Sequence, residues 1–382
     1  MKKIIDCEED FLKKLEKIID GMFPYGSVTR KINKIKQPRG GYLNINDFDV
    51  IQLDDGNELS EGFNVDARLV GLAADYLTRY MICIKPHKIK NEDDFIKSIE
   101  FKRDVFSISL GGLIRKLSIE KTNITESEEF YNFLKMLSNI QGLDDKSIIN
   151  ACKIVTYDSF FRGFYFHAIK SLQYNEINPN KETINNIRIM VERSINFYKE
   201  YGPVTQFGFG FVPKDFSGDD KEKQKLYEEK GSWGGYTYEV RSGDGDFLTA
   251  DTLWDFKVLK NKPQSKHTLQ LLMYWIMGQH SGQDIYKGIT KLGIFNPRYN
   301  IIYRIDISKI DTEIIKIIER NVLCYPECRI ETEKIDDGFC TCFQKHPSVR
   351  AGREDMNGYW YICCKCNKRL YDGYTEYLWK KK

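Results

Sequence analysis

The chain has 382 residues, 41% hydrophobic and 13% aromatic, so it can bury a sizeable core without disulfide bonds. Its 58 basic and 55 acidic residues leave a net charge of +3, which excludes a polycation that coats nucleic acid through bulk charge. No run approaches the roughly 20 apolar residues of a membrane-spanning helix, and the charged start lacks the apolar core of a signal peptide. We therefore expect a cytoplasmic protein with no membrane partner, in which any nucleic-acid surface is a local patch.

The first segment, residues 1–64, begins with apolar residues at helical spacing, which predict a helix from Phe11 to Met22. A stretch rich in Gly, Pro and Lys follows and reads VTRKINKIKQPRGG. Such a stretch could follow a phosphate backbone, or it could be a solvated loop. Its basic residues, with no acidic residue among them, are Arg30, Lys31, Lys34, Lys36 and Arg39.

The second segment, residues 65–202, has a helical pattern. The final run lies between Pro179-Asn180 and Gly202-Pro203, which are typical start and stop signals of a helix. We therefore expect a large helical region that is part of the following domain or inserted in it. Apolar residues recur at intervals of three and four and predict helices over residues 66–81, 93–119, 127–140, 145–172 and 180–201.

The third segment, residues 203–323, consists of short aromatic and β-branched runs bounded by Gly, Asn, Asp or Pro. One predicted helix over residues 265–280 interrupts these runs, and another over residues 308–323 ends the segment. This alternation predicts an α/β core with a mixed sheet flanked by helices. The runs predict strands over residues 204–212, 234–242, 245–250, 252–260, 291–297 and 301–307.

Acidic side chains are concentrated in the predicted hairpin GDGDFLTADTLWDFKV, residues 243–258. In a strand, residues two apart share a face, so Asp255 and Lys257 project to the side opposite their apolar neighbours. A tight turn over residues 249–252 would return Asp246 to a position beside Asp255 on the neighbouring strand. Two carboxylates and one lysine are therefore expected to converge.

This convergence has a specific chemical use. Two hard carboxylates hold Mg²⁺ or Mn²⁺, which shares its coordination with waters and phosphate oxygens. Such a cation polarises a phosphate and lowers the pKa of a bound water, and Lys257 would orient or deprotonate that water or offset developing charge. The hairpin therefore predicts phosphodiester cleavage by Asp246, Asp255 and Lys257. The alternative is a solvated hairpin with a cross-strand ion pair.

The same residues carry a family resemblance. The stretches GDGDF, LWDFKV and LQLLMYW present, in order, an acid, then Asp-x-Lys, then Gln-x-x-x-Tyr. Over residues 203–306 this order resembles the PD-(D/E)XK nuclease superfamily and, within it, the RecB-like nucleases. The resemblance implies that Gln270 and Tyr274 position the metal site or contact DNA, and that Lys266, one turn earlier on the same helix face, reaches a phosphate. A core role for Tyr274 is the alternative.

One feature of the RecB-like pattern cannot be assigned from the motifs. These nucleases usually carry a His or Glu on an early helix as a further metal ligand. Asp75, on the first predicted helix of the helical region, is the first candidate, ahead of Glu239 just before the hairpin. Asp244, between two glycines, replaces Asp246 if the register differs by two, and Asp251 is assigned to the turn.

The last segment, residues 324–382, holds seven of the ten cysteines, which favours metal over disulfides in a reducing cell. The Cys-x-x-Cys from Cys363 to Cys366 resembles the knuckle of a zinc ribbon, and Cys340-x-Cys342 supplies a second pair. These four are the preferred ligands of a structural Zn²⁺, which would stabilise a segment too short for its own core. Buried thiols without metal are the alternative. Other candidate ligands are Cys324, Cys328, His346 and Cys364.

Residues 343–382 also hold nine Lys and Arg against four Asp and Glu, interleaved with aromatic residues. This composition suits contact with phosphates and bases, or packing against the rest of the chain. The whole sequence predicts a PD-(D/E)XK-like, Mg²⁺- or Mn²⁺-dependent deoxyribonuclease with a C-terminal zinc-ribbon-like module and DNA, or else RNA, as its partner. The alternatives are a nucleic-acid-binding protein with a non-catalytic nuclease-like fold and a zinc hydrolase of small molecules.

Overall fold

The structure is a computed structural model that describes most of the chain. For residues 92–97 and for the two strands beyond residue 348, only the backbone is described. The helix expected from Phe11 to Met22 lies outside the described residues. The described residues are 26–83, 92–161, 174–214, 225, 230–328, 349–355 and 358–363.

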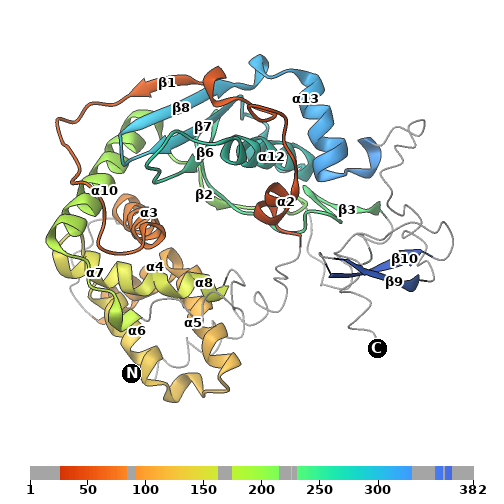
Figure 1. Ribbon diagram of the computed structural model, residues 1–382. Coiled ribbons are helices and arrows are strands. Elements are labelled where there is room, and N and C mark those ends of the chain that lie inside the picture. The colour runs from red at the N-terminus through yellow and green to blue at the C-terminus, as the bar shows by residue number, and fades with distance from the viewer. Residues whose placement is uncertain are drawn as a thin grey trace.

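A six-stranded mixed sheet forms the centre of the fold, in the order β1-β8-β7-β6-β5-β2 (Figure 1). Strands β6 and β7 run parallel, and every other pair of neighbours is antiparallel. Helix α12, Ser265–Ser281, connects the parallel pair, because parallel neighbours need a crossover connection. The strands are β1 Asp49–Gln52, β2 Gln206–Phe209, β5 Gly245–Leu248, β6 Thr252–Phe256, β7 Lys291–Asn296 and β8 Ile301–Asp306.

The predicted hairpin of β5 and β6 forms with the expected tight turn. Phe247 pairs with Trp254 across the two strands, and the N–H of Thr249 donates to the carbonyl of Thr252 at 3.0 Å. On the far side of β6, Gly293 of β7 pairs with Trp254 and leaves space for its indole, since a Cβ there would lie 2.3 Å from the ring. The alternation therefore fixes which side chains of β6 face which layer.

Apolar side chains cover both faces of the sheet. On one face, Phe197 of α10 stacks on Phe295 with ring centroids 4.2 Å apart and meets Trp254 edge-on at 4.9 Å. On the other face, Leu248 and Leu253 belong to the cluster formed with the apolar side of α12. The sheet is thus flanked by helices on both sides, as the sequence predicts for an α/β protein.

The helical region lies on the α10 face of the sheet and shares its core (Figure 1). Helix α10 begins where predicted, with the side chain of Asn180 accepting a hydrogen bond from the N–H of Thr183 at 2.9 Å. Because one apolar cluster joins these helices to Trp254 and Phe295, they do not form a separate core. The helices are α3 Ala67–Cys83, α4 Glu92–Val105, α5 Ser107–Ile119, α6 Glu128–Ser138, α7 Asp145–Ile154, α8 Asp158–Phe161 and α10 Lys181–Tyr201, with short helices η2 Ile124–Glu126, η3 Val155–Tyr157 and η4 Tyr174–Glu176.

Two predicted helices are interrupted in the structure. The run over residues 93–119 forms two helices that meet at the fully buried Phe106. The run over residues 145–172 leaves regular α-helical geometry after Ile154, and its part beyond Phe161 lies outside the described residues. Apolar spacing reports which face is buried, but it does not report where the helix axis changes direction.

The first segment contributes directly to the fold. Residues 28–34 form a helix, α2, with Val28 and Ile32 buried, so this half of the basic stretch is not a loop. Strand β1, which the sequence analysis did not predict, pairs with β8 at the edge of the sheet. The central sheet therefore extends across the predicted boundary at residue 64. The first segment also contains the short helix η1 Ile45–Asp47.

The helix predicted over residues 308–323 forms as α13, Thr312–Ile317, followed by a π-helical turn, η7 Ile318–Leu323. In the part of the chain that the structure describes, no helix has the length and apolar character to cross a membrane. The remaining elements are β3 Ser232–Trp233, β4 Tyr236–Thr237, η5 Asp284–Tyr286, η6 Ile307–Lys309, η8 Pro326–Cys328 and the hairpin of β9 Val349–Asp355 and β10 Gly358–Cys363.

Candidate active site

The structure brings the three predicted hairpin residues together. Phe247 pairs with Trp254, and the same register continued by one residue brings Asp246 opposite Asp255, so both carboxylates lie on one face. The N–H of Phe256 donates to Oδ2 of Asp246 at 2.6 Å, and Nζ of Lys257 donates to Oδ1 of Asp255 at 2.7 Å. The backbone N–H of Lys257 also donates to the carbonyl of Phe295 on β7 at 3.0 Å. The two acids and the amine therefore lie close together at the end of the hairpin, as predicted.

Asp255 is the most buried acid of this group, with 2% of the residue exposed. Burial raises the pKa of Asp255 to about 7; the charge of Lys257 opposes the rise and the neighbouring carboxylate of Asp246 adds to it. Within the residues that the structure describes, no donor reaches the buried Oδ2 of Asp255. A proton or a cation shared with Asp246 would satisfy this oxygen.

Gln270 and Tyr274 lie one turn apart on α12 and are hydrogen-bonded to each other. Nε2 of Gln270 donates to Oη of Tyr274 at 2.8 Å. The Tyr274 ring packs in the core against Phe209 and Phe211, so the ring itself is part of the core, as the alternative interpretation expected. Burial, with smaller contributions from acidic neighbours that include Asp255, raises the pKa of Tyr274 well above 10. Its hydroxyl therefore keeps its proton beside the acids.

Arg79 on α3 belongs to this site and was missed in the sequence analysis. Its Nε and Nη2 donate to Asp75 at 2.9 and 2.7 Å, and Nη2 lies 3.8 Å from Oδ1 of Asp246. Although burial opposes it, the charges of Asp75 and Asp246 raise the pKa of Arg79, so the guanidinium stays charged. The i,i+4 spacing of Asp75 and Arg79 indicates an ion pair, but nothing in it points to the hairpin.

The alternative acids occupy different surroundings. Asp75 reaches the site through Arg79, whereas Glu239 accepts from Nζ of Lys31 on α2 at 3.1 Å. Asp251 lies in the turn, as predicted, and pairs with Lys291 at 2.6 Å, while Asp244 is exposed. Of the two candidate acids, Asp75 is therefore the one linked to the hairpin, because Arg79 contacts both Asp75 and Asp246.

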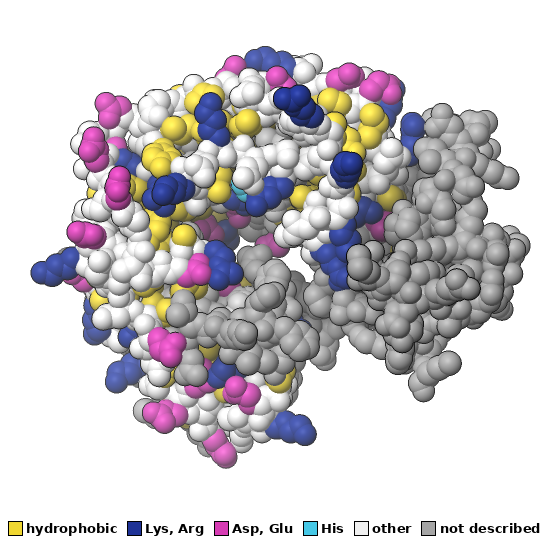
Figure 2. All heavy atoms as spheres, viewed as in Figure 1, with side chains coloured by type: hydrophobic (Ala, Val, Ile, Leu, Met, Phe, Trp, Pro, Cys, Tyr) yellow, Lys and Arg dark blue, Asp and Glu magenta, His cyan; other side chains and the backbone are white. Residues whose placement is uncertain are grey.

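The loop before α12 and the first turn of this helix are rich in lysine. The stretch from Lys257 to Lys266 contains Lys260 and Lys262 and no acidic residue, and the first turn of α12 is also free of acids. Burial, then the charges of Lys257 and Lys266, lower the pKa of His267 to about 4. Figure 2 shows Lys and Arg side chains gathered in the region of α2 and α12, beside a hollow in which acidic side chains are visible.

The predicted zinc ligands lie largely beyond the described residues. Cys340, Cys342 and Cys366 lie outside them, as do His346 and Cys364, and Cys363 ends β10 with only its backbone described. The β9–β10 hairpin pairs Cys363 with Val349. The zinc-ribbon-like module therefore stays a prediction.

Comparisons with protein-family models, with curated proteins and with solved structures found no match. The strongest part of the site's geometry is a set of side chains from three elements, β5, β6 and α3, that converge at one end of the hairpin.

Proposed function

We propose that the protein is a metal-dependent nuclease of the PD-(D/E)XK type that hydrolyses phosphodiester bonds in DNA. The observation that carries the proposal is Oδ2 of Asp255, which is buried beside Asp246 with no hydrogen-bond donor among the described residues. An unpaired carboxylate oxygen is costly to bury, and a divalent cation shared by two acids would offset that cost. The order of the three short motifs supports the same function.

The residues present suit a hard divalent cation. Asp246 and Asp255 offer carboxylate oxygens, and Asp75 is the candidate for a third ligand, so Mg²⁺ or Mn²⁺ fits better than a soft metal. When bound, the cation would polarise the scissile phosphate and lower the pKa of a coordinated water.

The chain's own residues would supply the other parts of the reaction. Nζ of Lys257 lies against Asp255, and a quarter of the Lys257 side chain is exposed, so its ammonium can contact a substrate phosphate or the attacking water. Gln270 holds the Tyr274 hydroxyl in place beside the acids. Lys266 and the lysines of the loop before it would attract the phosphate backbone.

Cleavage assays test this proposal directly. Supercoiled plasmid, linear duplex, single-stranded DNA and RNA are incubated with the full chain and Mg²⁺ or Mn²⁺. We expect Asp255→Asn and Lys257→Ala to lower the cleavage rate about 100-fold or more. Lys309→Ala serves as the control, because this exposed lysine pairs with Asp49 at the sheet edge. The proposal fails if the wild type cleaves nothing, or if both variants cleave at the wild-type rate.

A second candidate function is favoured by Arg79. Because its guanidinium pairs with Asp75 and lies 3.8 Å from Asp246, a fixed positive charge already compensates part of the acid cluster. A protein that binds nucleic acid without cutting it would need no metal at such a site. DNA binding of equal strength in EDTA and in Mg²⁺, with no cleavage under either condition, would select this function.

A further inference from the structure

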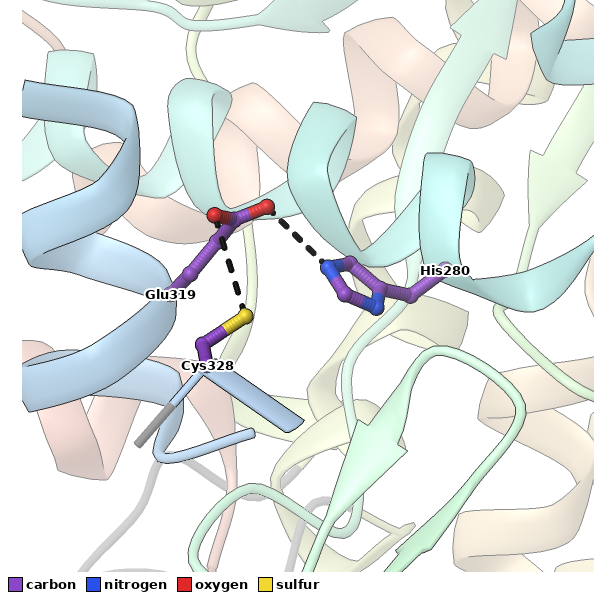
Figure 3. A group of neighbouring side chains, drawn as sticks. All are labelled: His280, Glu319 and Cys328. Atoms are coloured by element: carbon purple, nitrogen blue, oxygen red, sulfur yellow. Dashed lines mark hydrogen bonds and ion pairs between the residues drawn. The ribbon is translucent and has the colours of Figure 1, made fainter. Parts of the chain in front are cut away.

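A second group of ligand-type side chains lies where α12 ends. His280 near the end of α12, Glu319 in η7 and Cys328 at the end of η8 present ligand atoms within 4.8 Å of one another (Figure 3). Nε2 of His280 lies 3.1 Å from Oε1 of Glu319, and Sγ of Cys328 lies 3.9 Å from Oε2 of the same carboxylate. Three elements thus bring a nitrogen, an oxygen and a sulfur to one point.

These separations are close to those of a tetrahedral zinc site. Bonds of about 2.0 Å to nitrogen or oxygen and about 2.3 Å to sulfur place neighbouring ligand atoms roughly 3.3–3.7 Å apart. The two separations in the group, 3.1 and 3.9 Å, lie on either side of that range. The two contacts are made by different oxygens of Glu319, and one ligand atom from each residue lies within 4.8 Å of the others, so modest side-chain movements would bring the three into coordination. In Figure 3 one oxygen of the Glu319 carboxylate contacts the imidazole and the other contacts the thiol.

The imidazole of His280 is held from two further sides. Its ring stacks on Tyr325, with centroids 3.6 Å apart and an interplanar angle of 8°. Tyr325 is itself fully buried and donates from its hydroxyl to the carbonyl of Gly235 at 2.6 Å. The other ring nitrogen, Nδ1, lies 3.2 Å from Oε1 of Glu327. A carboxylate on the second nitrogen orients a histidine for metal binding at the first.

The backbone around the group departs from regular helix. Glu319 belongs to a π-helical turn, a geometry that is rare and frequent at functional sites. Directly after this turn, Cys324 adopts a left-handed conformation with φ of 62°, which reverses the chain and returns Cys328 toward Glu319. Irregular backbone thus brings the two ligands on this segment toward the end of α12.

We propose that His280, Glu319 and Cys328 bind a Zn²⁺ ion, with Glu327 orienting the histidine. Imidazole nitrogen, carboxylate oxygen and thiolate sulfur are all ligands that zinc accepts, whereas the set at the acid hairpin is all oxygen. The ion would fasten the end of α12 to the segment that leads into the cysteine-rich tail. This site is separate from Asp246 and Asp255 and does not depend on the proposed nuclease activity. The competing explanation is a metal-free ion pair of His280 with the two glutamates.

Zinc content of the purified full chain distinguishes the two explanations. We expect His280→Gln, Glu319→Gln and Cys328→Ser each to hold one zinc fewer per chain than the wild type by elemental mass spectrometry. The difference is the readout, since the cysteine-rich tail can hold zinc of its own. Cys83→Ser is the control, because Cys83 is an exposed cysteine on α3 outside the group, and it should keep the wild-type content.

Two further measurements make the test sharper. Glu327→Gln should weaken zinc binding about 10- to 100-fold without abolishing it. With Co²⁺ in place of zinc, Cys328→Ser should lose part of the thiolate-to-cobalt charge-transfer absorption. Glu319→Gln can still accept the hydrogen bond from His280, so its fold should be preserved, as circular dichroism would verify. Equal zinc content and affinity in the wild type, Glu319→Gln and Cys328→Ser would overturn the proposal.

Discussion

At the scale of single residues, Asp255 combines deep burial with a neighbouring acid. Burial first, and Asp246 in addition, raise its pKa to about 7 against the opposing charge of Lys257, whereas the same carboxyl ionises near 4 when the chain is unfolded. Between about pH 4 and pH 7, Asp255 is therefore protonated in the folded state and ionised in the unfolded state. The contribution of this carboxyl to the free energy of unfolding is fully present below about pH 4 and is lost as the pH rises to about 7.

We accordingly predict that, without metal, the unfolding free energy falls between about pH 4 and pH 7 in the wild type and falls less in Asp255→Asn. The expected contribution is at most about 1.4 kcal/mol per pH unit for one proton. Thermal and urea unfolding in EDTA at closely spaced pH values would measure it. The comparison between the two proteins removes the contributions of histidines elsewhere, and parallel pH profiles would contradict the prediction.

Arg79 provides a second prediction at this scale. Arg79→Met should lower the metal-free unfolding free energy by about 3 kcal/mol, because it removes the guanidinium charge that pairs with Asp75 and Asp246 in a largely buried place. Added Mn²⁺ should then raise the melting temperature more in the variant than in the wild type. Arg68→Met is the control on the same helix, since its pair with Asp66 is solvent-exposed and worth under about 1 kcal/mol. Equal destabilisation by the two changes would contradict the role assigned to Arg79.

At the scale of elements, Gly245 decides how closely β2 approaches β5. A Cβ at this position would lie 1.9 Å from the Phe209 ring, which is buried and cannot move aside. We predict that Gly245→Ala lowers the unfolding free energy by about 1–3 kcal/mol. If the proposed function is correct, cleavage also falls, because Asp246 is the next residue. Urea denaturation measures the first effect, and Gly142→Ala, which has open space for its Cβ, should be close to neutral.

The elements around the acids could be predicted from sequence because each has a local signal. Strand β6 is a short buried run with β-branched and aromatic residues that places Asp255 between Trp254 and Phe256, and the spacing of Gln270 and Tyr274 on α12 places both on one face. Strand β1 has no comparable signal, since three of its four residues are exposed and its place is set by pairing with β8. Likewise, the sequence of α3 predicts only an amphipathic helix. Arg79 comes close to Asp246 because α3 packs near the hairpin, which lies far away in the sequence.

At the scale of the whole molecule, Arg193 of α10 links segments far apart in the chain. Its guanidinium donates to Asp55 at 2.7 and 2.9 Å, to the carbonyl of Asn57 at 2.6 Å, and to the carbonyls of Pro297 and Arg298 at 3.0 and 2.8 Å. The side chain is only 5% exposed. The contacts therefore fasten the segment after β1 to the turn between β7 and β8.

We predict that Arg193→Lys lowers the unfolding free energy by about 3 kcal/mol, because one ammonium cannot satisfy a carboxylate and three carbonyls. Limited proteolysis should become faster within residues 53–66. Arg188→Lys, on the same helix, is the control, since its partner Asp145 is largely exposed. Unchanged proteolysis in Arg193→Lys would show that other contacts hold this segment.

The parallel pairing of β6 with β7 has a consequence for synthesis on the ribosome. The backbone N–H of Lys257 donates a hydrogen bond to the carbonyl of Phe295, and Phe295 is translated only after α12. A nascent chain released before residue 291 would contain Asp246, Asp255 and Lys257. It would lack β7, the strand that pairs with β6. Premature termination would thus release a fragment with an incomplete sheet, and the surroundings of the acid hairpin would be complete only once β7 and β8 are made.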